Sequence, residues 1–468
     1  MHSSDRRAFL NWSVSGLATT AALAFLQREG FVSANSCATA KAKRVVQITL
    51  IGGMSHLDTF DFKPELVKRH GSSLKTDSKP DVFFGQVGLL RKPDWEFQRR
   101  GKSGLWVSEL FPHLAKVADD LTVLRSMTSE SANHTPALFV QNSGFQFNGY
   151  PALGSWLSYG LGSLADDLPA FVVLPDGRGE ANGAASNWSS GFLPAQHQGV
   201  LFRGGATAVR DLFPKQQIQP AEEKDSRALL ALLNGRHLKR SGNEADLSAR
   251  IKSYELAAKM QLAVPAVTDL ARETAQTKAR YGIDDAVTAD CGRRCLLARR
   301  LLEKGVRFVQ VYSGGPIAGT PRTSWDAHEN VLENHGTEAA RIDKPVAALV
   351  QDLKERGMLN ETLVLFTTEF GRTPFTQSAG NVVGTGRDHN KYGFTCWLAG
   401  AGLKPGLAFG ATDEIGWKAV EHPITWHDFH ATVLHLLGIH HEKLTYYHNG
   451  IQRRLTNVHG EVVKDILA

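Results

Sequence analysis

Short apolar runs alternate with amphipathic segments over most of this chain. The first run, KRVVQITLI at residues 43–51, is rich in β-branched residues and nearly uninterrupted by polar ones. A strand needs such a run when a parallel sheet buries it on both faces, because a strand with one wet face alternates apolar and polar residues instead. Strands that alternate with amphipathic helices predict an α/β fold, in which helices flank a central, mostly parallel sheet. The other predicted strands span residues 121–124, 171–174, 306–312, 362–367 and 394–398, and the predicted helices span residues 110–118, 221–233, 245–262, 291–302, 342–356 and 425–437.

The organisation predicted for the mature chain is a single domain over residues 41–468. A share of 42% hydrophobic residues is enough for a substantial core, which excludes a disordered protein. Residues 215–300 are charged and helical in pattern, with no good strand, and we interpret them as a helical insertion. Residues 177–205 are rich in Gly, Ala, Ser and Asn and predict a long loop. The net charge of +6 is not concentrated in one block, so nucleic acid is not an expected partner.

Residues 1–40 have the features of a twin-arginine (Tat) signal peptide. Arg6 and Arg7 are followed by Phe9-Leu10, an apolar stretch at residues 12–26 and small residues suited to a peptidase. The apolar stretch is about 15 residues long, below the roughly 20 that span a bilayer, so we expect no stable membrane insertion. The alternative is an uncleaved membrane anchor. We expect the protein to be exported through the Tat pathway to the periplasm or the cell exterior.

Acidic residues and histidines follow several of the predicted strands or precede the last one. The carboxyl ends of parallel strands meet at one edge of a sheet, and ligands bind there. A mixed set of carboxylates and imidazoles suits a divalent metal ion such as Zn, Ca, Mg or Mn, which polarises an ester oxygen and activates a hydroxyl group. Each residue alone has a simple structural explanation, such as a pairing of Glu369 with Arg372, and only their joint placement favours a site. The candidate ligands are Asp58, Asp326, His328, Glu369, Asp388 and His389.

Several stretches of the chain together resemble a known family. The chain resembles domain-of-unknown-function family 1501, a group of exported bacterial proteins related to the sulfatase and alkaline-phosphatase superfamily. The resemblance covers nearly the whole predicted mature chain and implies an alkaline-phosphatase/sulfatase-like α/β fold. The stretches that carry it are GGMSHLDTFD at residues 52–61, SGFLP at 190–194, WDAH at 325–328, TEFGRTP at 368–374, GRDH at 386–389 and ATVLHLLG at 431–438.

The resemblance also implies roles for individual metal ligands. Asp326 and His328 are similar to the Asp/His pair of the alkaline-phosphatase metal site. Glu369 takes a metal-ligand position at the end of its strand, and His389 is similar to the later metal histidine of that superfamily. Superfamily enzymes usually place an Asp directly after the first strand, where this chain has two glycines and reaches Asp58 only five residues later.

The catalytic residues depart further from the superfamily pattern. The sulfatase nucleophile motif, Cys or Ser followed by x-Pro-Ser-Arg, is absent, and HTPAL at residues 134–138 is the nearest analogue. This places His134 at the nucleophile position with Thr135 beside it, and a Thr hydroxyl next to a metal is a plausible nucleophile. Arg372 or Arg387 would have to replace the missing arginine that clamps an anion.

Two functions from different classes fit these observations. The first is an exported, metal-dependent hydrolase of sulfate or phosphate esters, whose substrate is a sulfated or phosphorylated small molecule or polysaccharide. In it, Thr135 or a metal-activated water attacks, and Arg372 holds the anion. The alternative is a sulfatase-like binding protein without turnover, for a carbohydrate or a protein partner, and the missing nucleophile motif favours it. The sequence specifies neither the substrate, nor the metal, nor the oligomeric state.

Eight of the 18 histidines fall between residues 422 and 459. His427 and His430 are three apart on one face of a predicted helix, and we interpret them as hydrogen-bonded imidazoles of a helix packed on the sheet. For His56, near the end of the first strand, a site role and a structural role both stay open. Cys291 and Cys295 are four apart on a predicted helix, which is a poor geometry for a disulfide, so we expect free thiols.

Overall fold

The computed structural model describes residues 40–76, 80–203, 208–210, 212–213, 219–241, 245–317 and 322–468. The predicted Tat signal at residues 1–40 lies outside the described residues, apart from its last position. None of the helices in the described ranges combines the length and the hydropathy that a bilayer crossing requires.

Eight strands form the central sheet, in the order β12-β4-β11-β8-β1-β7-β5-β6. β1 lies in the middle and runs parallel to β7 and β8, and β5 and β6 continue in the same direction. β11 runs antiparallel to both of its neighbours, β4 and β8. The predicted mostly parallel sheet is therefore confirmed, with one reversed strand. The strands are β1 (Arg44–Leu50), β4 (Leu121–Met127), β5 (Phe171–Leu174), β6 (Val200–Leu201), β7 (Phe308–Ser313), β8 (Thr362–Thr368), β11 (Phe394–Gly400) and β12 (Leu407–Phe409).

The reversal of β11 follows from the hairpin before it. After β8 ends, the chain forms β9 (Gly371–Thr376) and β10 (Arg387–Asn390) as an antiparallel pair beyond the edge of the sheet. β11 therefore starts where the parallel strands end. The sequence did not predict this direction, because an apolar run has the same pattern either way. The other small antiparallel pairs are β2 (Phe97–Arg100) with β3 (Leu105–Ser108), β13 (Ala411–Thr412) with β14 (Ala419–Glu421) and β15 (Tyr446–His448) with β16 (Ile451–Arg453).

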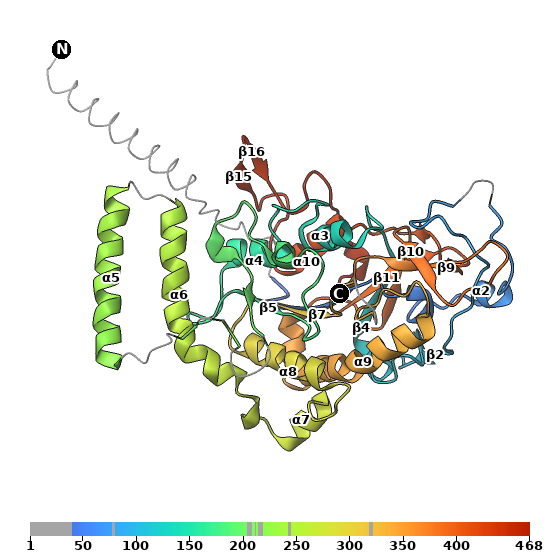
Figure 1. Cartoon of the computed structure of the whole chain (residues 1–468), viewed down its shortest axis with the longest axis horizontal. Helices are drawn as coiled ribbons and strands as arrows, with labels where there is room; N and C mark the ends of the chain where they lie inside the picture. Colours follow the sequence, from blue (N-terminus) through green and yellow to red (C-terminus); the bar gives the residue numbers. More distant parts are fainter. Residues whose placement is uncertain are drawn as a thin grey trace, which may run out of the picture.

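Helices cover both faces of the sheet (Figure 1). On one face α8 and α9 share a buried cluster with Val46, Ile48 and Leu50 of β1. On the other, α3, α4 and α10 pack with Val45. Burial on both faces explains why β1 is a nearly continuous apolar run. The helices are α2 (Pro64–Lys68), α3 (His134–Ser143), α4 (Leu153–Leu161), α5 (Pro220–Arg240), α6 (Ala245–Thr268), α7 (Ala275–Tyr281), α8 (Ala289–Glu303), α9 (Val331–Glu355) and α10 (Trp426–Leu436), with short 3-10 turns at His56–Asp58, Leu114–Asp120, Ala184–Trp188, Ala195–His197, Leu270–Arg272, Met358–Glu361 and Lys464–Ile466.

Four helices, α2, α3, α4 and α7, are not among those predicted from the sequence. α3 buries seven of its ten residues, including polar ones such as Gln141 and Asn142. A helix without a solvated face shows no amphipathic period, so the pattern gave no signal there. The predicted helix at residues 110–118 is instead a 3-10 run, Leu114–Asp120.

The predicted insertion at residues 215–300 is helical in the structure, where described, and holds α5, α6, α7 and most of α8. Figure 1 shows α5 and α6 side by side at one end of the molecule, with α5 farther from the sheet. In contrast, α8 packs against β7 and α9 and contributes to the core. Only the first part of the range therefore stands apart from the sheet.

Candidate metal centre

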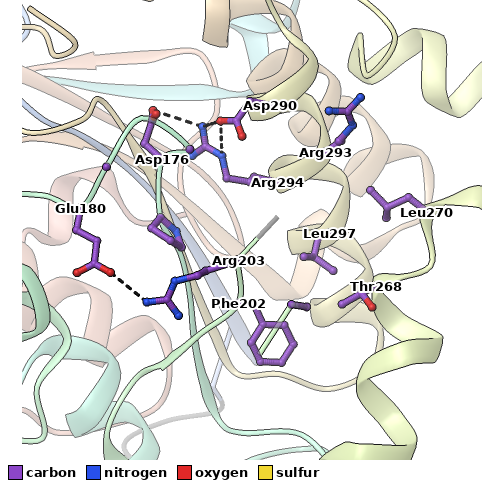
Figure 2. Close-up of a pocket in the computed structure, with 14 residues that line it drawn as sticks. Asp176, Glu180, Phe202, Arg203, Thr268, Leu270, Asp290, Arg293, Arg294 and Leu297 are labelled. Atoms are coloured by element: carbon purple, nitrogen blue, oxygen red, sulfur yellow. Dashed lines mark hydrogen bonds and ion pairs between the residues drawn. The ribbon is translucent and has the colours of Figure 1, made fainter. Parts of the chain in front are cut away.

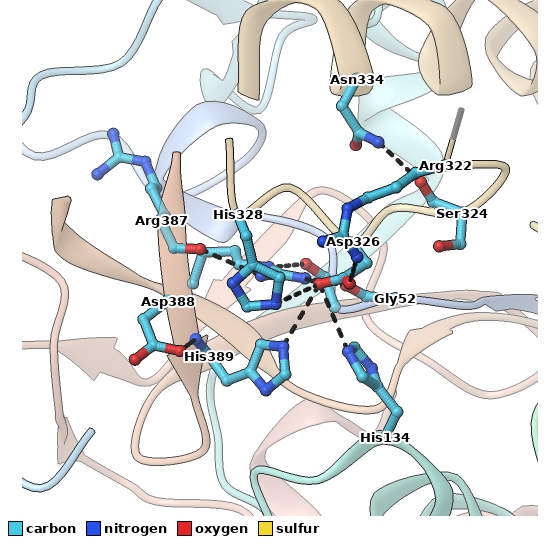
Figure 3. Close-up of polar contacts among 12 residues, drawn as sticks. Gly52, His134, Arg322, Ser324, Asp326, His328, Asn334, Arg387, Asp388 and His389 are labelled. Atoms are coloured by element: carbon cyan, nitrogen blue, oxygen red, sulfur yellow. Dashed lines mark hydrogen bonds and ion pairs between the residues drawn. The ribbon is translucent and has the colours of Figure 1, made fainter. Parts of the chain in front are cut away.

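Four buried side chains converge beyond the carboxyl edge of the sheet: His134, Asp326, His328 and His389. One potential ligand atom from each lies within 4.8 Å of all the others. The three Nε2 atoms all point at the same carboxylate oxygen, Oδ1 of Asp326, at 2.8 Å for His328, 3.4 Å for His389 and 3.5 Å for His134 (Figure 3). We call these four residues the HDHH cluster.

The fold brings the cluster together from three distant parts of the chain. His134 begins α3, Asp326 and His328 lie in the loop between β7 and α9, and His389 lies on β10. The loop after β1 fits closely beneath Asp326. Gly52 has a φ of +114°, and a Cβ on it would lie 2.4 Å from the backbone nitrogen of Asp326. Only glycine fits that position without strain.

Each imidazole of the cluster is fixed through its other ring nitrogen. Nδ1–H of His134 donates to Glu369 Oε1 at 2.8 Å, and Nδ1–H of His389 donates to the carbonyl of Ala132 at 2.6 Å. His328 donates in the same way to the side-chain oxygen of Gln377. Because these acceptors cannot donate, each Nδ1 carries a proton, and a ring in its neutral form then presents a lone pair at Nε2. Hydrogen-bond partners of this kind orient histidines for binding a metal.

The arrangement at Asp326 fits a cation better than it fits the bare side chains. Nε2 of His134 is buried and makes no hydrogen bond within the described residues. Burial lowers the pKa of His389 well below its ordinary value, so its Nε2 meets the Asp326 carboxylate as a lone pair. Two electron-rich atoms that face one another are stabilised by a positive ion between them. The cluster could therefore hold a metal ion through three nitrogens and one carboxylate oxygen.

Two arginines hold the Asp326 carboxylate. Burial alone would raise its pKa, but the Arg372 guanidinium and the imidazoles hold the pKa of Asp326 far below the ordinary value. Nη2 of Arg372 donates to Oδ1 at 2.7 Å, and Arg322 donates to Oδ2. Asp326 therefore stays ionised, as a metal ligand must be.

The pKa of His134 is shifted in the opposite direction to that of Asp326. Burial lowers its pKa, but Asp326 and Glu369 on either side outweigh burial and raise it above the ordinary value. In the absence of a metal, His134 is therefore the ring of the cluster that takes up a proton. A proton and a metal ion compete for the same nitrogen.

The other predicted ligands lie close to the cluster but do not belong to it. Glu369 orients His134 and also accepts from the Gly52 backbone N–H at 2.8 Å. Asp388 accepts from the backbone N–H groups of His389 and Phe84, at 2.7 and 2.9 Å.

Asp58 and His56 lie in the loop after β1 and make their hydrogen bonds outside the cluster. Asp58 is fully buried and accepts from Arg387 at 3.0 Å and from Ser55 at 2.5 Å. Burial would raise its pKa, but Arg387 lowers the pKa below the ordinary value. Nε2 of His56 lies 2.7 Å from the Gly416 carbonyl, outside the cluster.

The predicted catalytic residues have different surroundings. His134 belongs to the cluster, and Thr135 follows it, half-buried, in the first turn of α3. Arg372 is fully buried, and besides Asp326 it donates to the carbonyls of Gly52, Gly53 and Arg387. It therefore positions the Asp326 loop and does not face open space.

Sequence reasoning missed several residues that matter here. Gln377, which orients His328, lies on the turn after β9, and no sequence signal marks it. Phe83 and Phe84 lie over the cluster, with ring centroids 4.9 Å from His389 and 4.8 Å from His328 respectively. Both phenylalanines are about half exposed, at 44% and 52%. They therefore cover the imidazoles on the side that faces solvent.

Two cavities border the cluster. One of about 300 Å³ is lined by His389, Phe83 and Tyr392. The other, of about 640 Å³, is lined by Asp326, Arg322 and Arg178. A third cavity, of about 560 Å³, lies at the end of β5 (Figure 2) and includes none of the cluster residues in its lining. Two of its arginines are paired with acids, Arg203 with Glu180 at 3.1 Å and Arg294 with Asp290 at 2.6 Å (Figure 2). The third, Arg293, donates to the carbonyl of Ile283.

His427 and His430 are hydrogen-bonded imidazoles of a packed helix, as the sequence predicted. Nε2 of His427 lies 2.9 Å from the carbonyl of Gly144, and Nε2 of His430 lies 2.9 Å from that of Gln141. Both acceptors are at the end of α3, so the two imidazoles join α10 to the helix that carries His134.

Solved structures similar to this chain include sulfatases and phosphatase relatives. The PsFucS1 sulfatase from Pseudoalteromonas sp. is 13% identical, with a TM-score of 0.38 over 91% of this chain and 72% of the other. A protein in the alkaline phosphatase superfamily from Vibrio parahaemolyticus is 10% identical, with a TM-score of 0.37 over 88% and 70%. A phosphonate monoester hydrolase from Silicibacter pomeroyi is 13% identical, with a TM-score of 0.32 over 70% and 68%. At these values the similarity carries no information about activity.

The sequence comparisons identify a family but no characterised relative. A search of curated proteins finds no match. The model of a family described as "Protein of unknown function (DUF1501)" matches residues 42–467, which is nearly all of the chain. The chain therefore belongs to the DUF1501 family.

Proposed function

We propose that this protein is an exported, metal-dependent hydrolase of sulfate or phosphate esters. The observation that carries the proposal is the convergence of three Nε2 atoms on Asp326 Oδ1, with an acceptor at every Nδ1. A structural imidazole needs only a hydrogen bond, whereas three imidazoles oriented on one carboxylate form a ligand set.

The donor set favours a particular kind of ion. Imidazole nitrogens suit Zn, Cu, Fe and Ni, whereas Ca and Mg prefer oxygen ligands. With three nitrogens and one oxygen, zinc is the ion we propose among Zn, Ca, Mg and Mn. A bound ion of this kind supplies a Lewis acid for the ester oxygen and lowers the pKa of water.

The chain's own residues would bind and orient the substrate. Arg322 has a side chain that is 30% exposed, and it lines the 640 Å³ cavity next to Asp326. Arg322 also pairs with Asp326 and with the exposed Glu329. Because it reaches the solvent beside the cluster, we propose Arg322 as the group that meets a sulfate or phosphate, with Arg372 as a positioning residue behind Asp326. Thr135, beside His134, is the proposed nucleophile if the reaction proceeds through a covalent intermediate. Phe83 and Phe84 would limit the access of water.

The alternative function is binding without turnover. One observation favours it: Arg372, the predicted anion clamp, is fully buried and already bonded to three carbonyls and Asp326. A carbohydrate or protein ligand would then occupy the cavity beside the cluster, and the metal would order the loop.

Metal analysis combined with ester hydrolysis tests the proposal. The purified full chain, supplied with Zn, should bind about one ion per chain and hydrolyse 4-nitrophenyl sulfate or 4-nitrophenyl phosphate. The variant His389→Ala should lose both the ion and the turnover. His430→Gln changes an equally buried histidine outside the cluster and should keep both. Bound metal without turnover on either ester would favour the alternative, and absence of bound metal would refute both metal-dependent functions.

The proposed export has its own test. Because a Tat signal depends on its arginine pair, Arg6→Lys combined with Arg7→Lys should retain the protein in the cytoplasm. Fractionation of cells that express the two forms measures this directly. Equal distribution of both forms between the fractions would count against Tat export.

A further inference from the structure

Helix α5 exposes a leucine-rich surface that no other described residue covers. Leu229, Leu230, Leu232 and Leu233 expose 57%, 54%, 51% and 49% of their surface. Figure 1 shows α5 as the outer of the two helices that stand at the end of the molecule. Exposed leucines grouped on one helix in this way indicate an interaction site more than leucines scattered singly over a surface do.

One side of α5 contacts α6. Arg227 donates to Gln261 on α6 at 2.5 Å. The half-buried residues of α5, Glu223, Asn234 and Leu238, follow at the spacings that share this side of the helix. The leucines at positions 229 and 233 are therefore turned away from α6.

The side of α5 turned away from α6 carries a regular series of exposed residues. Their spacing alternates between four and three, which keeps them on one face of a helix. We call this series the outer stripe. Its members are Glu222, Ser226, Leu229, Leu233, Arg236 and Arg240.

The outer stripe of one copy is complementary to the outer stripe of a second copy that runs in the opposite direction. When two copies of α5 lie antiparallel about position 231, Glu222 of one copy meets Arg240 of the other. Leu229 of one copy meets Leu233 of the other in the same alignment. Glu222 at one end is thus matched with Arg240 at the other, Ser226 meets Arg236, and the leucines lie between them. A parallel alignment would instead place like charges together, which is unfavourable.

We propose that a second copy of this chain docks antiparallel along the outer stripe, which makes the protein a two-fold symmetric dimer through α5. Each contact of such an isologous interface occurs twice, so a modest pairing counts double. The leucines supply buried apolar area, and the ends fix the register. The proposal is independent of the chemistry at the metal centre.

The apolar half of the interface is tested by the mass of the full chain in solution, measured by light scattering over a range of concentrations. Wild type should approach the mass of two chains, and Leu229→Glu combined with Leu233→Glu should give the mass of one. Leu262→Glu, on α6 and 83% exposed, changes a leucine outside the stripe and should leave the dimer intact. Because these positions are exposed, both variants should unfold at the same temperature as wild type within a few degrees.

The pairing of Glu222 with Arg240 is tested by exchanging the two charges. Glu222→Arg alone, or Arg240→Glu alone, should raise the dimer dissociation constant about tenfold. The two changes together should return it to within about threefold of wild type, because the pair is restored with reversed polarity.

Three results would overturn the proposal. One is a wild-type chain that stays monomeric up to about 100 µM, because the dimer affinity would then be weaker than a specific interface gives. Another is a dimer that survives both leucine changes or is not rescued by the charge swap. The third is a monomer that binds vesicles of anionic lipid through the same leucines, which would make the stripe a membrane contact.

Discussion

Three imidazoles and one guanidinium contact Oδ1 of Asp326, so a change at this carboxylate disturbs several side chains at once. Both arginines and all three rings contact this one carboxylate. Removing the carboxylate would leave buried positive charge without a partner, which is costlier than the pairings themselves. For this reason the outer partners of the rings are better probes of the site than Asp326.

Gln377 is the simplest such probe. Gln377→Leu removes the acceptor for Nδ1–H of His328 while keeping the volume of the side chain. Loss of the hydrogen-bond partner of a ligating histidine typically lowers metal affinity by about 10- to 100-fold, and we expect that range for zinc. Competition titration with a coloured chelator measures it. Gln351→Leu, on the exposed side of α9, is the matched control, and equal affinities for the two variants would contradict the assigned role.

Gly52 tests how tightly the loops beneath the cluster fit. Gly52→Ala would force a Cβ to 2.4 Å from the Asp326 nitrogen at a φ of +114°. We expect a loss of about 3 kcal/mol in the free energy of unfolding, from backbone strain and overpacking together. Gly71→Ala also has a positive φ, +78°, but meets nothing within 4 Å, so it should cost only about 1 kcal/mol. Chemical denaturation separates the two, and equal losses would show that the close approach is unimportant.

At the scale of elements, α10 supports the cluster through α3. His427 and His430 join α10 to the C-terminal end of α3, whose first residue is His134. The N-terminus of α10 is closed by a capping box between Thr425 and Asp428. The position of His134 therefore depends on a helix more than 280 residues later in the chain.

The capping box makes a measurable prediction. Thr425→Ala leaves the Asp428 backbone N–H without its side-chain acceptor and should cost about 1 kcal/mol of folding stability. Thr337→Ala, exposed in the interior of α9, should change stability by less than about 0.5 kcal/mol. Denaturant titration of both variants checks this. If Thr337→Ala proved the more costly, the cap would not contribute as described.

For the molecule as a whole, buried neutral histidines predict acid sensitivity. Burial lowers the pKa of His335 and of His430 to about 3, against about 6.5 in an unfolded chain. Above pH 6.5 both states are neutral and stability is unaffected. Below pH 6.5 these histidines are protonated in the unfolded chain but stay neutral in the folded one, so stability falls until about pH 3. Thermal unfolding at a series of pH values measures the slope.

A variant identifies the source of that slope. His430→Gln keeps a donor for the Gln141 carbonyl but removes the titrating group, so stability should fall less steeply between pH 6.5 and 3. His459→Gln, which is exposed, should leave the slope unchanged. An unaltered slope in His430→Gln would assign the acid sensitivity to other groups.

The sequence predicted the sheet and the neighbourhood of the site better than the site itself. Continuous apolar runs identified β1, β7 and β8, because burial on both faces leaves no other pattern. Asp326, His328 and His389 were predicted as ligands and meet in one cluster. Glu369 and Asp388 could not be separated from them, since the choice between a ligand and its support depends on distances of a few ångströms. The role of Gln377 depends on a contact across 49 positions that no local pattern records.

The hydrogen bonds at the three Nδ1 atoms have a consequence for how the protein gains and loses its ion. These bonds hold the imidazoles whether or not a metal is present, so loading requires little ordering of the chain. Treatment with a chelator should therefore leave a folded protein with unchanged circular dichroism, and added zinc should restore binding without refolding. This is the opposite of small zinc domains, which unfold when the metal is removed. In the exported location proposed above, such a centre would lose its ion and bind it again without unfolding.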